Sequence, residues 1–411
     1  MTTIMHRNAK GIIAALLAFL LLACTPALAA PADAGRQAKE AKAGTNAAVV
    51  DEINEHLAVM NAEELAATLK LLRVRGLINA AYVDGTSKID LMTGAVKGAI
   101  EAVGDPYSQY FDAHTLKEFM IEAKGVFGGV GMVLGMKDKR ITVIAPIEGT
   151  PADRAGIASG DWIIAINGQT TKDMALDAAV SKIRGKEGTE VILTVGRTGQ
   201  EPSDYTIVRD TIEIKTVAGK MLEGDIGYIR LTFFNENTGE SFAAKLRELE
   251  GQGMKAAILD LRNNPGGILE ESVKVAGQFI PRGPVVSVVT RDGSRRTSYA
   301  EPGGPRYPLV VLINGGSASA SEIVAGAVQD TGAGTLVGTH SFGKGSVQNL
   351  VPLGDGTAIK LTVARYHTPK DRVIDGVGLE PDVLVVQPAD ARETGRDTQL
   401  ERAIEVLREK L

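Results

Sequence analysis

Hydrophobic and polar positions follow a helical period in the first part of the chain. Apolar residues recur at helical spacing from residue 49 to about 121, and one helical face collects Leu65, Leu69, Leu72 and Leu77. Gly104-Asp105-Pro106 ends a second helix, because proline cannot continue a helix and disfavours the α region for the residue before it. Residues 47–122 are therefore predicted to form a helical N-terminal region.

The pattern then changes to short alternating stretches. The strands predicted there are Arg140–Ala145, Trp162–Ile166 and Glu190–Val195, and turns rich in Gly and Asp separate them. One amphipathic stretch, Ala175–Arg184, is predicted to be a helix. Residues 123–214 are therefore expected to form a small, mostly β domain.

From Gly224 onward, buried strands alternate with helices. Ala256–Leu261 and Leu309–Ile313 are nearly continuous apolar runs, as expected for strands covered on both faces. Each run is followed by a glycine-rich turn and a helix, predicted over Leu269–Phe279 and up to about Gln329. Further strands are predicted at Thr335–Gly338 and Ala358–Ala364. The order predicts right-handed crossovers and a largely parallel sheet in a mixed α/β domain over residues 215–390, before a C-terminal helix within 391–411.

Composition excludes several classes of protein. Apolar residues make up 44% of the 411-residue chain, which is enough for buried cores and excludes wholesale disorder. The net charge of −5, with both signs well mixed, argues against a nucleic-acid binder, which needs a basic surface. Aromatic residues are only 4%, so a stacking platform for single strands is not expected either.

The first 29 residues are typical of an export signal. A short basic start precedes the apolar run Gly11–Ala23, which is too short to span a bilayer comfortably. Ala27-Leu28-Ala29 suits a signal peptidase, whereas Leu21–Cys24 suits lipoprotein processing with a lipid on Cys24; an uncleaved anchor is a third possibility. All three predict a location outside the cytoplasm, in the periplasm or on the extracytoplasmic face of the membrane. Residues 30–46 are expected to be a linker, and the lone cysteine excludes internal disulfides.

Candidate chemistry gathers on two glycine-rich turns that follow predicted strands. In open α/β sheets, ligands bind beyond the carboxyl ends of the strands, where Asn263–Gly267 and Asn314–Ser321 are expected. The second turn brings Ser317, Ser319 and Ser321 to the start of a helix, whose free N–H groups can stabilise an oxyanion. The alternative is that these serines only cap the helix.

Lys344 lies between two glycines, which is unusual for a solvated surface charge. As a general base for a serine, its amine must be neutral, so its pKa must fall roughly three units from about 10.4, and burial in an apolar pocket can achieve this. Phe342 and Val347 are close enough in sequence to line such a pocket, and Gln348 can orient the amine by accepting a hydrogen bond. The alternative is an exposed loop lysine.

Three other readings of this segment are weaker. Gly338–Lys344 matches the start of a P-loop, but Gly345 stands where the magnesium-binding Ser or Thr belongs. Ser341 and Lys344 have the spacing of a β-lactamase motif, but the flanking glycines disfavour the helix that this chemistry needs. A Ser–His–Asp triad would depend on His340, the only credible histidine base. No spacing of His, Cys or Asp suggests a metal site, and no cofactor is expected.

The motifs resemble those of the C-terminal processing (tail-specific) peptidases. Three segments carry the resemblance, which covers about residues 65–390: Asp260–Gly267, Asn314–Glu322 and Phe342–Gln348. The resemblance implies a peptidase core of the crotonase/ClpP-like type, with Ser319 as the nucleophile, Lys344 as the general base and Gln348 as the residue that holds the lysine. It also implies an oxyanion hole formed by the N–H of Ala320 and that of Gly266 or Gly267. His340 stands where Thr or Pro is expected, which affects no catalytic residue.

The β domain at 123–214 is similar to a PDZ domain. Gly128-Gly129-Val130-Gly131-Met132 resembles the loop that binds a terminal carboxylate through backbone N–H groups, beside a strand edge that pairs with the peptide. The resemblance therefore implies substrate binding at Gly129, Val130, Gly131 and Met132. In such proteins the PDZ domain can also gate the active site, and Arg184 is the residue expected to couple it to the core.

The sequence thus predicts a serine endopeptidase that cleaves exported proteins near their C-termini. Two alternatives are a non-catalytic PDZ scaffold for binding peptides and an esterase that uses His340. The expected partners are protein or peptide substrates, with an adaptor protein as a possibility and no nucleic acid. A homodimer is predicted, with Val49–Leu77 and Thr398–Leu411 as the helices that pack between subunits.

Overall fold

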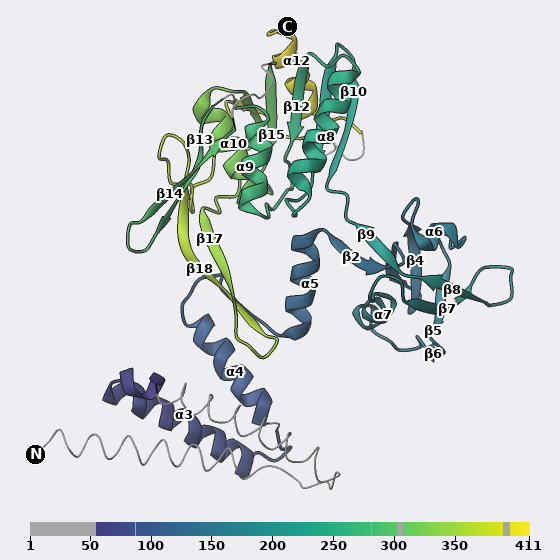
Figure 1. Ribbon diagram of the computed structural model, residues 1–411, viewed down its shortest axis with the longest axis vertical. Coiled ribbons are helices and arrows are strands. Elements are labelled where there is room, and N and C mark those ends of the chain that lie inside the picture. The colour runs from purple at the N-terminus through teal and green to yellow at the C-terminus, as the bar shows by residue number, and fades with distance from the viewer. Residues whose placement is uncertain (1–54, 87, 281, 302–306, 389–394) are drawn as a thin grey trace, which may run out of the picture. The chain divides into compact units, whose positions relative to one another are not determined.

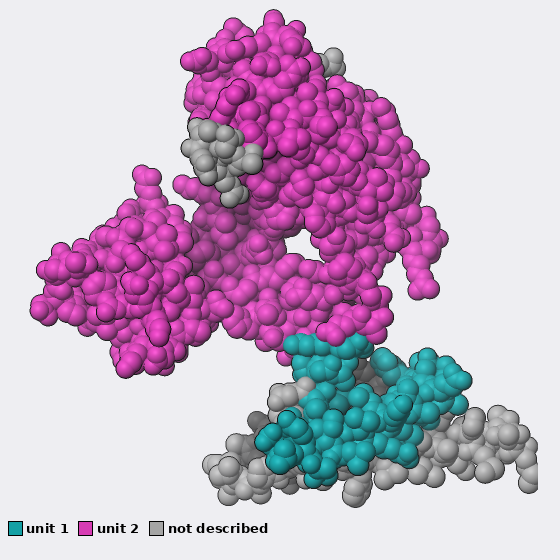
Figure 2. Space-filling model, turned by 180° about the vertical axis from the view of Figure 1, so that it is seen from behind, with its two compact units in different colours: residues 1–99 teal, residues 100–411 magenta. Residues whose placement is uncertain are grey.

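The structure is a computed structural model that describes residues 55–86, 88–280, 282–301, 307–388 and 395–411 (Figure 1). The chain divides into two units, Met1–Ala99 and Ile100–Leu411, which are coloured separately in Figure 2. The predicted export signal and linker lie outside the described residues. Within the described part of the chain, no helix has both the length and the apolar character needed to cross a membrane.

The first unit contains helix α3 (Ala62–Ala81) and most of α4 (Lys88–Glu101). α3 begins with a capping box: the Asn61 side chain accepts from the N–H of Glu64 at 3.0 Å, and the Glu64 carboxylate accepts from the N–H of Asn61 at 2.8 Å. α3 buries none of its residues, and Leu77 on the predicted apolar face is 68% exposed. The predicted helix is therefore confirmed, but its apolar face is not covered by described residues.

The β domain is built on one antiparallel sheet of six strands. The sheet has the order β3-β4-β5-β7-β8, with β6 on β5, and a separate pair joins β2 to β9. The strands are β2 (Val126–Gly129), β3 (Met132–Lys137), β4 (Arg140–Pro146), β5 (Trp162–Ile166), β6 (Gln169–Thr170), β7 (Glu190–Gly196), β8 (Ser203–Val208) and β9 (Asp210–Glu213), with helices α6 (Pro151–Arg154) and α7 (Leu176–Ile183). The three predicted strands and the predicted helix are confirmed to within one residue, and β3 lies at the edge of the sheet.

The α/β domain has a six-stranded sheet of order β10-β11-β12-β15-β16-β19. The strands are β10 (Val217–Leu222), β11 (Ile226–Leu231), β12 (Ala256–Asp260), β15 (Leu309–Ile313), β16 (Thr335–Gly338) and β19 (Val383–Leu384). Only β10 runs antiparallel to its neighbour, so the predicted, largely parallel sheet is confirmed.

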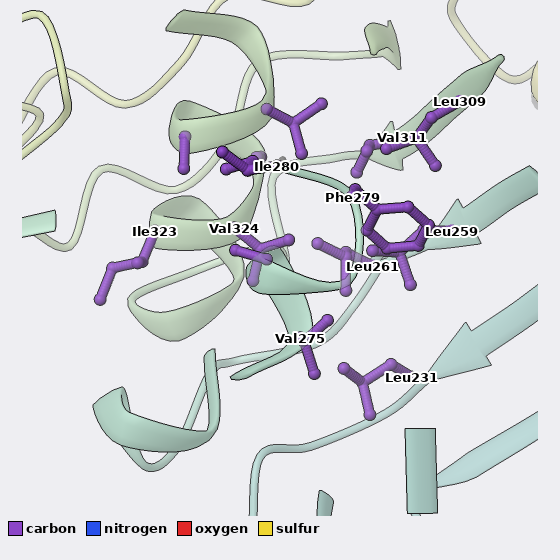
Figure 3. Close-up of a cluster of buried hydrophobic side chains, with 14 of the residues drawn as sticks. Leu231, Leu259, Leu261, Val275, Phe279, Ile280, Leu309, Val311, Ile323 and Val324 are labelled. Atoms are coloured by element: carbon purple, nitrogen blue, oxygen red, sulfur yellow. The ribbon is translucent and has the colours of Figure 1, made fainter. Parts of the chain in front are cut away.

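Both faces of this sheet are covered by helices. Alternate residues of a strand point to opposite faces, so Leu259 of β12 packs in the cluster of α8 (Thr238–Gly251), α9 (Leu269–Gly277) and α10 (Ala320–Thr331), shown in part in Figure 3. Ile258 points the other way, into a cluster with α12 (Thr398–Arg408). This double cover explains why β12 and β15 are apolar throughout.

A second, antiparallel sheet has the order β1-β18-β13-β14, with β17 paired to β18. Its strands are β1 (Gln109–Phe111), β13 (Gly283–Thr290), β14 (Arg295–Ala300), β17 (Ser346–Pro352) and β18 (Ala358–His367). Only β18 was predicted, three residues shorter. The helix α5 (Ala113–Lys124) follows β1 and leads into β2. The sheet therefore connects the α/β domain to the segment that enters the β domain.

A buried ionic cluster anchors the C-terminal helix to the sheet. The Arg262 guanidinium lies 2.7 Å from the Asp260 carboxylate and 2.8 Å from that of Asp397, the N-cap of α12. The Tyr228 hydroxyl also donates to Asp260 at 2.7 Å, and burial together with the charge of Asp260 raises the pKa of Tyr228 to about 12. Asp260 is fully buried, so its charge depends on these partners.

We predict that Arg262→Met lowers the free energy of unfolding by about 3–5 kcal/mol, because it removes the cation that is hydrogen-bonded to the buried Asp260 carboxylate and leaves only Arg230, 3.7 Å away. Guanidinium chloride unfolding of the full chain measures the change. Arg402→Met is the matched control, since its partner Glu405 lies on the surface and no measurable change is expected. Equal losses in the two variants would contradict a special role for the buried cluster.

Candidate active site

Two turns meet at the carboxyl ends of β12 and β15, which are parallel neighbours. The side chains of Asn263 and Asn314 fasten them together: the Asn314 amide donates to Asn263 Oδ1 at 3.0 Å, and the Asn263 N–H donates to Asn314 Oδ1 at 2.9 Å. The Ala318 N–H also donates to the Asn264 carbonyl at 3.0 Å. The two glycine-rich turns predicted from the sequence therefore form one connected structure.

The three serines of the second turn have different environments. The Ser317 hydroxyl donates to the Leu261 carbonyl at 2.8 Å, and the Ser321 hydroxyl donates to the Asn264 carbonyl at 2.9 Å; both side chains are fully buried. Ser319 is partly exposed, and among the described residues its hydroxyl donates to no carbonyl. Ser317 and Ser321 thus join the two turns, and only the Ser319 hydroxyl is left for chemistry.

Ser319 also has a strained backbone. Its φ of 56° and ψ of −115° lie outside the regions that residues with a side chain usually adopt, and it directly precedes α10. Such strain persists only where the surroundings enforce it, and it is frequent at functional sites. Here the Glu322 carboxylate accepts from the Ser319 N–H at 2.9 Å, and the Tyr366 hydroxyl lies 3.1 Å from the Ser319 carbonyl. These contacts hold Ser319 in a sharp strand-to-helix turn.

The Glu322 carboxylate also holds the lysine loop. Its Oε2 accepts from the Lys344 N–H at 2.9 Å, and its Oε1 accepts from the Gly343 N–H at 2.7 Å and the Ser341 hydroxyl at 2.5 Å. Glu322 is fully buried, so four donors replace the water that it has lost. This role of Glu322 was not predicted from the sequence, although Ser319 and Glu322 have the spacing of a capping box.

A second side chain, that of Tyr366 on β18, also connects the serine turn to the lysine loop. Its hydroxyl is within donating range of the carbonyls of both Ser319 and Lys344, and the residue is fully buried. Burial, followed by the charges of Glu322 and Asp375, raises the pKa of Tyr366, so the hydroxyl keeps its proton. No pattern in the sequence pointed to this tyrosine, because it contributes from a strand of the other sheet.

The Lys344 side chain is half-buried against an aromatic ring. Its Nζ lies 4.7 Å from the centre of the Tyr107 ring. Burial, and then the charge of Lys360, lowers the pKa of Lys344, while Asp105 and Glu322 act in the opposite direction. The lysine pocket is thus present, but its aromatic residue is not Phe342, which is 57% exposed. Val347 instead packs against the buried core of the α/β domain.

Gln348 lies near the lysine but does not contact it through a hydrogen bond in the described structure. Its amide nitrogen donates to Ser346 Oγ at 2.9 Å and to Thr362 Oγ1 at 3.0 Å, whereas its carbonyl oxygen has no donor among the described residues. The described residues likewise contain no hydrogen bond between Ser319 Oγ and Lys344 Nζ. The hydrogen bonds of the described residues thus hold the backbone of the candidate site, but they do not join the side chains of Ser319, Lys344 and Gln348 to one another.

The two glycines of the first turn have distinct positions. A β-carbon at Gly266 would lie 2.8 Å from that of Ser319, so only glycine allows this approach. The Gly266 N–H donates to Asn264 Oδ1 at 2.9 Å, whereas the Gly267 N–H has no acceptor among the described residues. Ala320, the first residue of α10, has an N–H that no helical carbonyl can reach.

His340 lies on its own loop. Its Nδ1 is 2.8 Å from the Ser341 carbonyl, and its Nε2 is 3.7 Å from the exposed carboxylate of Glu380. No hydrogen bond joins it to Ser319 in the described part of the chain.

The loop expected to bind a carboxylate has free donors and occupied acceptors. Gly129 ends β2 and Met132 begins β3, and neither Val130 nor Gly131, which lie between them, donates its N–H to an acceptor among the described residues. The Val130 carbonyl accepts from Ala152, and the Gly131 carbonyl accepts from Ile147 and the Thr150 hydroxyl. A short concave run of open N–H groups beside the edge strand β3 suits an anion.

Arg184, which follows α7, connects the β domain to α5. Its guanidinium forms an ion pair with Glu118 of α5 and lies 4.5 Å from the centre of the Phe127 ring. The side chain is only 21% exposed. Arg184 therefore contacts the helix that leads to the second sheet.

Three parts of the chain match three known protein families. Residues 225–385 match peptidase family S41, residues 142–197 match the PDZ domain, and residues 32–115 match the N-terminal domain of the activating protease CtpB. The carboxy-terminal-processing protease of Bartonella bacilliformis is 40% identical over 331 residues, covering 79% of this chain and 76% of that protein. The carboxy-terminal processing protease CtpB of Bacillus subtilis is 37% identical, covering 78% and 68%.

A solved photosystem II D1 C-terminal processing protease is similar as well, with 29% identity, a TM-score of 0.47, and coverage of 85% of this chain and 98% of that chain. The matches to peptidase family S41 and to the PDZ domain place this chain in one class, the S41 serine peptidases that carry a PDZ domain. Within that class, this chain belongs to the carboxy-terminal processing proteases.

We predict that Glu322→Gln lowers kcat at least tenfold with little change in KM, because an amide can offer only one oxygen to four donors and turns its NH₂ toward the rest. Steady-state hydrolysis of a peptide substrate measures both constants. Glu270→Gln is the control, since Glu270 is exposed and lies 4.0 Å from its partner Arg296. Unchanged kcat in Glu322→Gln would contradict the role given to this carboxylate.

Proposed function

We propose that Ser319 is the nucleophile of this peptidase and Lys344 its general base. One observation carries the proposal: of three serines in the turn, only Ser319 has a hydroxyl not committed to the neighbouring turn, and one carboxylate joins its backbone to that of Lys344. The neutral amine takes the hydroxyl proton as Ser319 Oγ attacks the peptide carbonyl. The protonated lysine then gives a proton to the departing amine, and water hydrolyses the acyl-enzyme ester.

For the oxyanion hole, the N–H groups of Gly267 and Ala320 are the best supported donors. The Gly266 N–H is occupied by Asn264, whereas the other two have no acceptor in the described structure. Gly266 has a separate role, because its lack of a side chain lets the two turns touch. Gln348 is the proposed partner of the lysine in the working enzyme, since its carbonyl oxygen is free to accept from the amine while its nitrogen stays anchored.

The PDZ domain is proposed to bind the C-terminus of the substrate. The open N–H groups of Val130 and Gly131 suit the terminal carboxylate, and the edge strand β3, from Met132 on, suits pairing with the preceding residues. The contact of Arg184 with Glu118 supports its role in coupling this domain to the core and in gating activity. A non-catalytic scaffold, the alternative considered from the sequence, would give no physical reason for the strained Ser319.

The proposed substrates are exported proteins cleaved near their C-termini. The predicted signal in residues 1–29 supports a location in the periplasm or at the extracytoplasmic face, with a lipid on Cys24 as one form of anchoring. The uncovered apolar residues of α3, such as Leu77, support a homodimer through the N-terminal helices. An adaptor protein that presents substrate is compatible with the PDZ domain.

Single alanine variants of the three serines test the nucleophile. We expect Ser319→Ala to abolish peptide hydrolysis with little loss of stability, because among the described residues its hydroxyl forms no hydrogen bond to the neighbouring turn. Ser317→Ala and Ser321→Ala should each cost about 1 kcal/mol of stability, because each removes one buried hydrogen bond between the two turns, yet retain activity. Hydrolysis assays and thermal unfolding of the same samples separate the two effects.

The matched pair Lys344→Ala and His340→Ala then tests the base. Loss of activity in the lysine variant alone supports the proposal. Full activity in Lys344→Ala with loss in His340→Ala would replace the Ser–Lys mechanism with one that uses histidine.

For the PDZ domain, we expect C-terminal amidation of a peptide ligand to weaken binding at least tenfold, because amidation removes the charge that the open N–H groups of Val130 and Gly131 would bind. Calorimetry with the full chain carrying Ser319→Ala measures both peptides without cleavage. Equal affinity for the free and amidated peptides would contradict carboxylate capture.

A further inference from the structure

The segment before β1 is a fixed turn that lies against β18. Asp105 accepts from the Tyr107 N–H at 3.1 Å and from the Ser108 hydroxyl at 2.6 Å. The Ser108 oxygen in turn accepts from the Thr362 N–H of β18 at 3.1 Å. The backbone on both sides of Tyr107 is therefore held by hydrogen bonds, which fix the point from which its side chain extends.

The same strand residue also reaches the candidate active site. The Thr362 hydroxyl accepts from the Gln348 amide at 3.0 Å, so one polar chain runs from Asp105 through Ser108 and Thr362 to Gln348. A cavity of about 480 Å³ lies along this chain, with Gly343 of the lysine loop in its wall. The turn that carries Tyr107 is thus built into the surroundings of Lys344.

The contact between Tyr107 and Lys344 favours one form of the lysine. The face of an aromatic ring attracts an ammonium and gives no comparable stabilisation to a neutral amine. A general base must be the neutral amine, and it must reach the Ser319 hydroxyl. In this structure the Lys344 Nζ lies 4.7 Å from the ring centre, and no hydrogen bond joins it to Ser319 or Gln348 in the described part of the chain.

We infer that Tyr107 is a positioning residue that holds Lys344 as an ammonium on its ring face, and that Lys344 must leave this face before it acts as a base. The inference rests on the proposed Ser–Lys mechanism for its consequence in catalysis. The contact itself is independent of that mechanism. Tyr107 therefore sets the fraction of enzyme molecules whose lysine is ready to react.

The groups around the lysine act in both directions, and their net effect lowers the pKa of Lys344, so the ring face opposes the surroundings that favour the neutral amine. Asp105 and Glu322 favour the ammonium, whereas burial and Lys360 disfavour it. Lys360 is itself held over the rings of Phe111 and Phe119, at 5.4 and 5.6 Å from their centres. Burial, followed by the charge of Asp375, raises the pKa of Tyr107, so its hydroxyl keeps its proton. That hydroxyl forms no hydrogen bond within the described residues.

The test compares Tyr107→Leu with Tyr107→Phe in the full chain. Leucine keeps an apolar cover over Lys344 but removes the ring face, whereas phenylalanine keeps the ring and removes only the hydroxyl. Pulse labelling with an amine-reactive anhydride across a pH series, read on the Lys344 peptide by mass spectrometry, gives the pH at which this amine becomes neutral. Thermal unfolding checks that each variant is folded.

We expect the midpoint of Lys344 labelling to fall by about half a pH unit or more in Tyr107→Leu, because loss of a cation–π contact of ordinary strength favours the neutral amine, and to stay unchanged in Tyr107→Phe. The acid limb of kcat/KM should move to lower pH by the same amount, with a severalfold gain near pH 7. An unchanged labelling midpoint in Tyr107→Leu, or equal shifts in both variants, would overturn the inference.

Failure of the Ser–Lys mechanism gives a different result. Labelling does not require activity, so it reports the contact between Tyr107 and Lys344 even if Lys344→Ala remains an active peptidase. In that case the labelling midpoint would still fall in Tyr107→Leu while its kcat/KM profile stayed that of the parent enzyme.

Discussion

The Glu322 carboxylate is the constraint on which the arrangement of the site depends. Its two oxygens accept from the backbone of Ser319 and of Lys344, and from two further donors on the lysine loop. A buried carboxylate costs several kcal/mol in desolvation unless such donors replace water. Moving the serine turn away from the lysine loop would therefore expose the Glu322 carboxylate or deprive it of hydrogen-bond donors. The distance between the two backbones is fixed for this reason.

A fixed backbone leaves the side chains to decide whether the site is assembled. Tyr366 adds a second connection between the same two loops, and the turn at Asn263–Gly267 is fastened to the serine turn through Asn314. Lys344 and Gln348 are different, because their functional groups point to neighbours outside the proposed reaction. In the proposed mechanism, assembly of the site thus needs rotation of these side chains rather than rebuilding of loops.

Prediction from sequence succeeded for elements whose surroundings allow only one pattern of residues. β15 was predicted to the residue, because a strand covered by helices on both faces must be apolar throughout. The turns after β12 and β15 were likewise predicted, since glycine is needed where chains approach as closely as Gly266 and Ser319 do. The strands β13, β14 and β17 were missed, because they are partly exposed and mix polar with apolar residues without a clear period.

Sequence could not reveal the contacts of the site that join segments far apart along the chain. Glu322 has the spacing of a helix cap, and only the fold shows that the same carboxylate binds the lysine loop. Tyr107 lies more than two hundred residues before Lys344, so no local pattern could connect them, and the apolar partner expected from proximity in sequence, Phe342, points into solvent. In a fully extended chain Phe342 and Lys344, two residues apart, would share a face, but Gly343 between them has a φ of 92° and bends the loop, so closeness in sequence is a poor guide to the lining of this pocket.

The positions of α5 and β18 offer a structural route for the proposed coupling between the PDZ domain and Lys344. α5 carries Glu118, the partner of Arg184, and it follows directly from β1, which pairs with β18. β18 in turn supplies Thr362, which anchors both the Tyr107 turn and Gln348. Coupling between two sites requires an element with two arrangements that both sites bias. In the proposed mechanism the Lys344 side chain is this element. Its two alternative partners are the ring of Tyr107 and the carbonyl oxygen of Gln348, which accepts no hydrogen bond within the described residues, and both are attached to β18, the strand that pairs with β1.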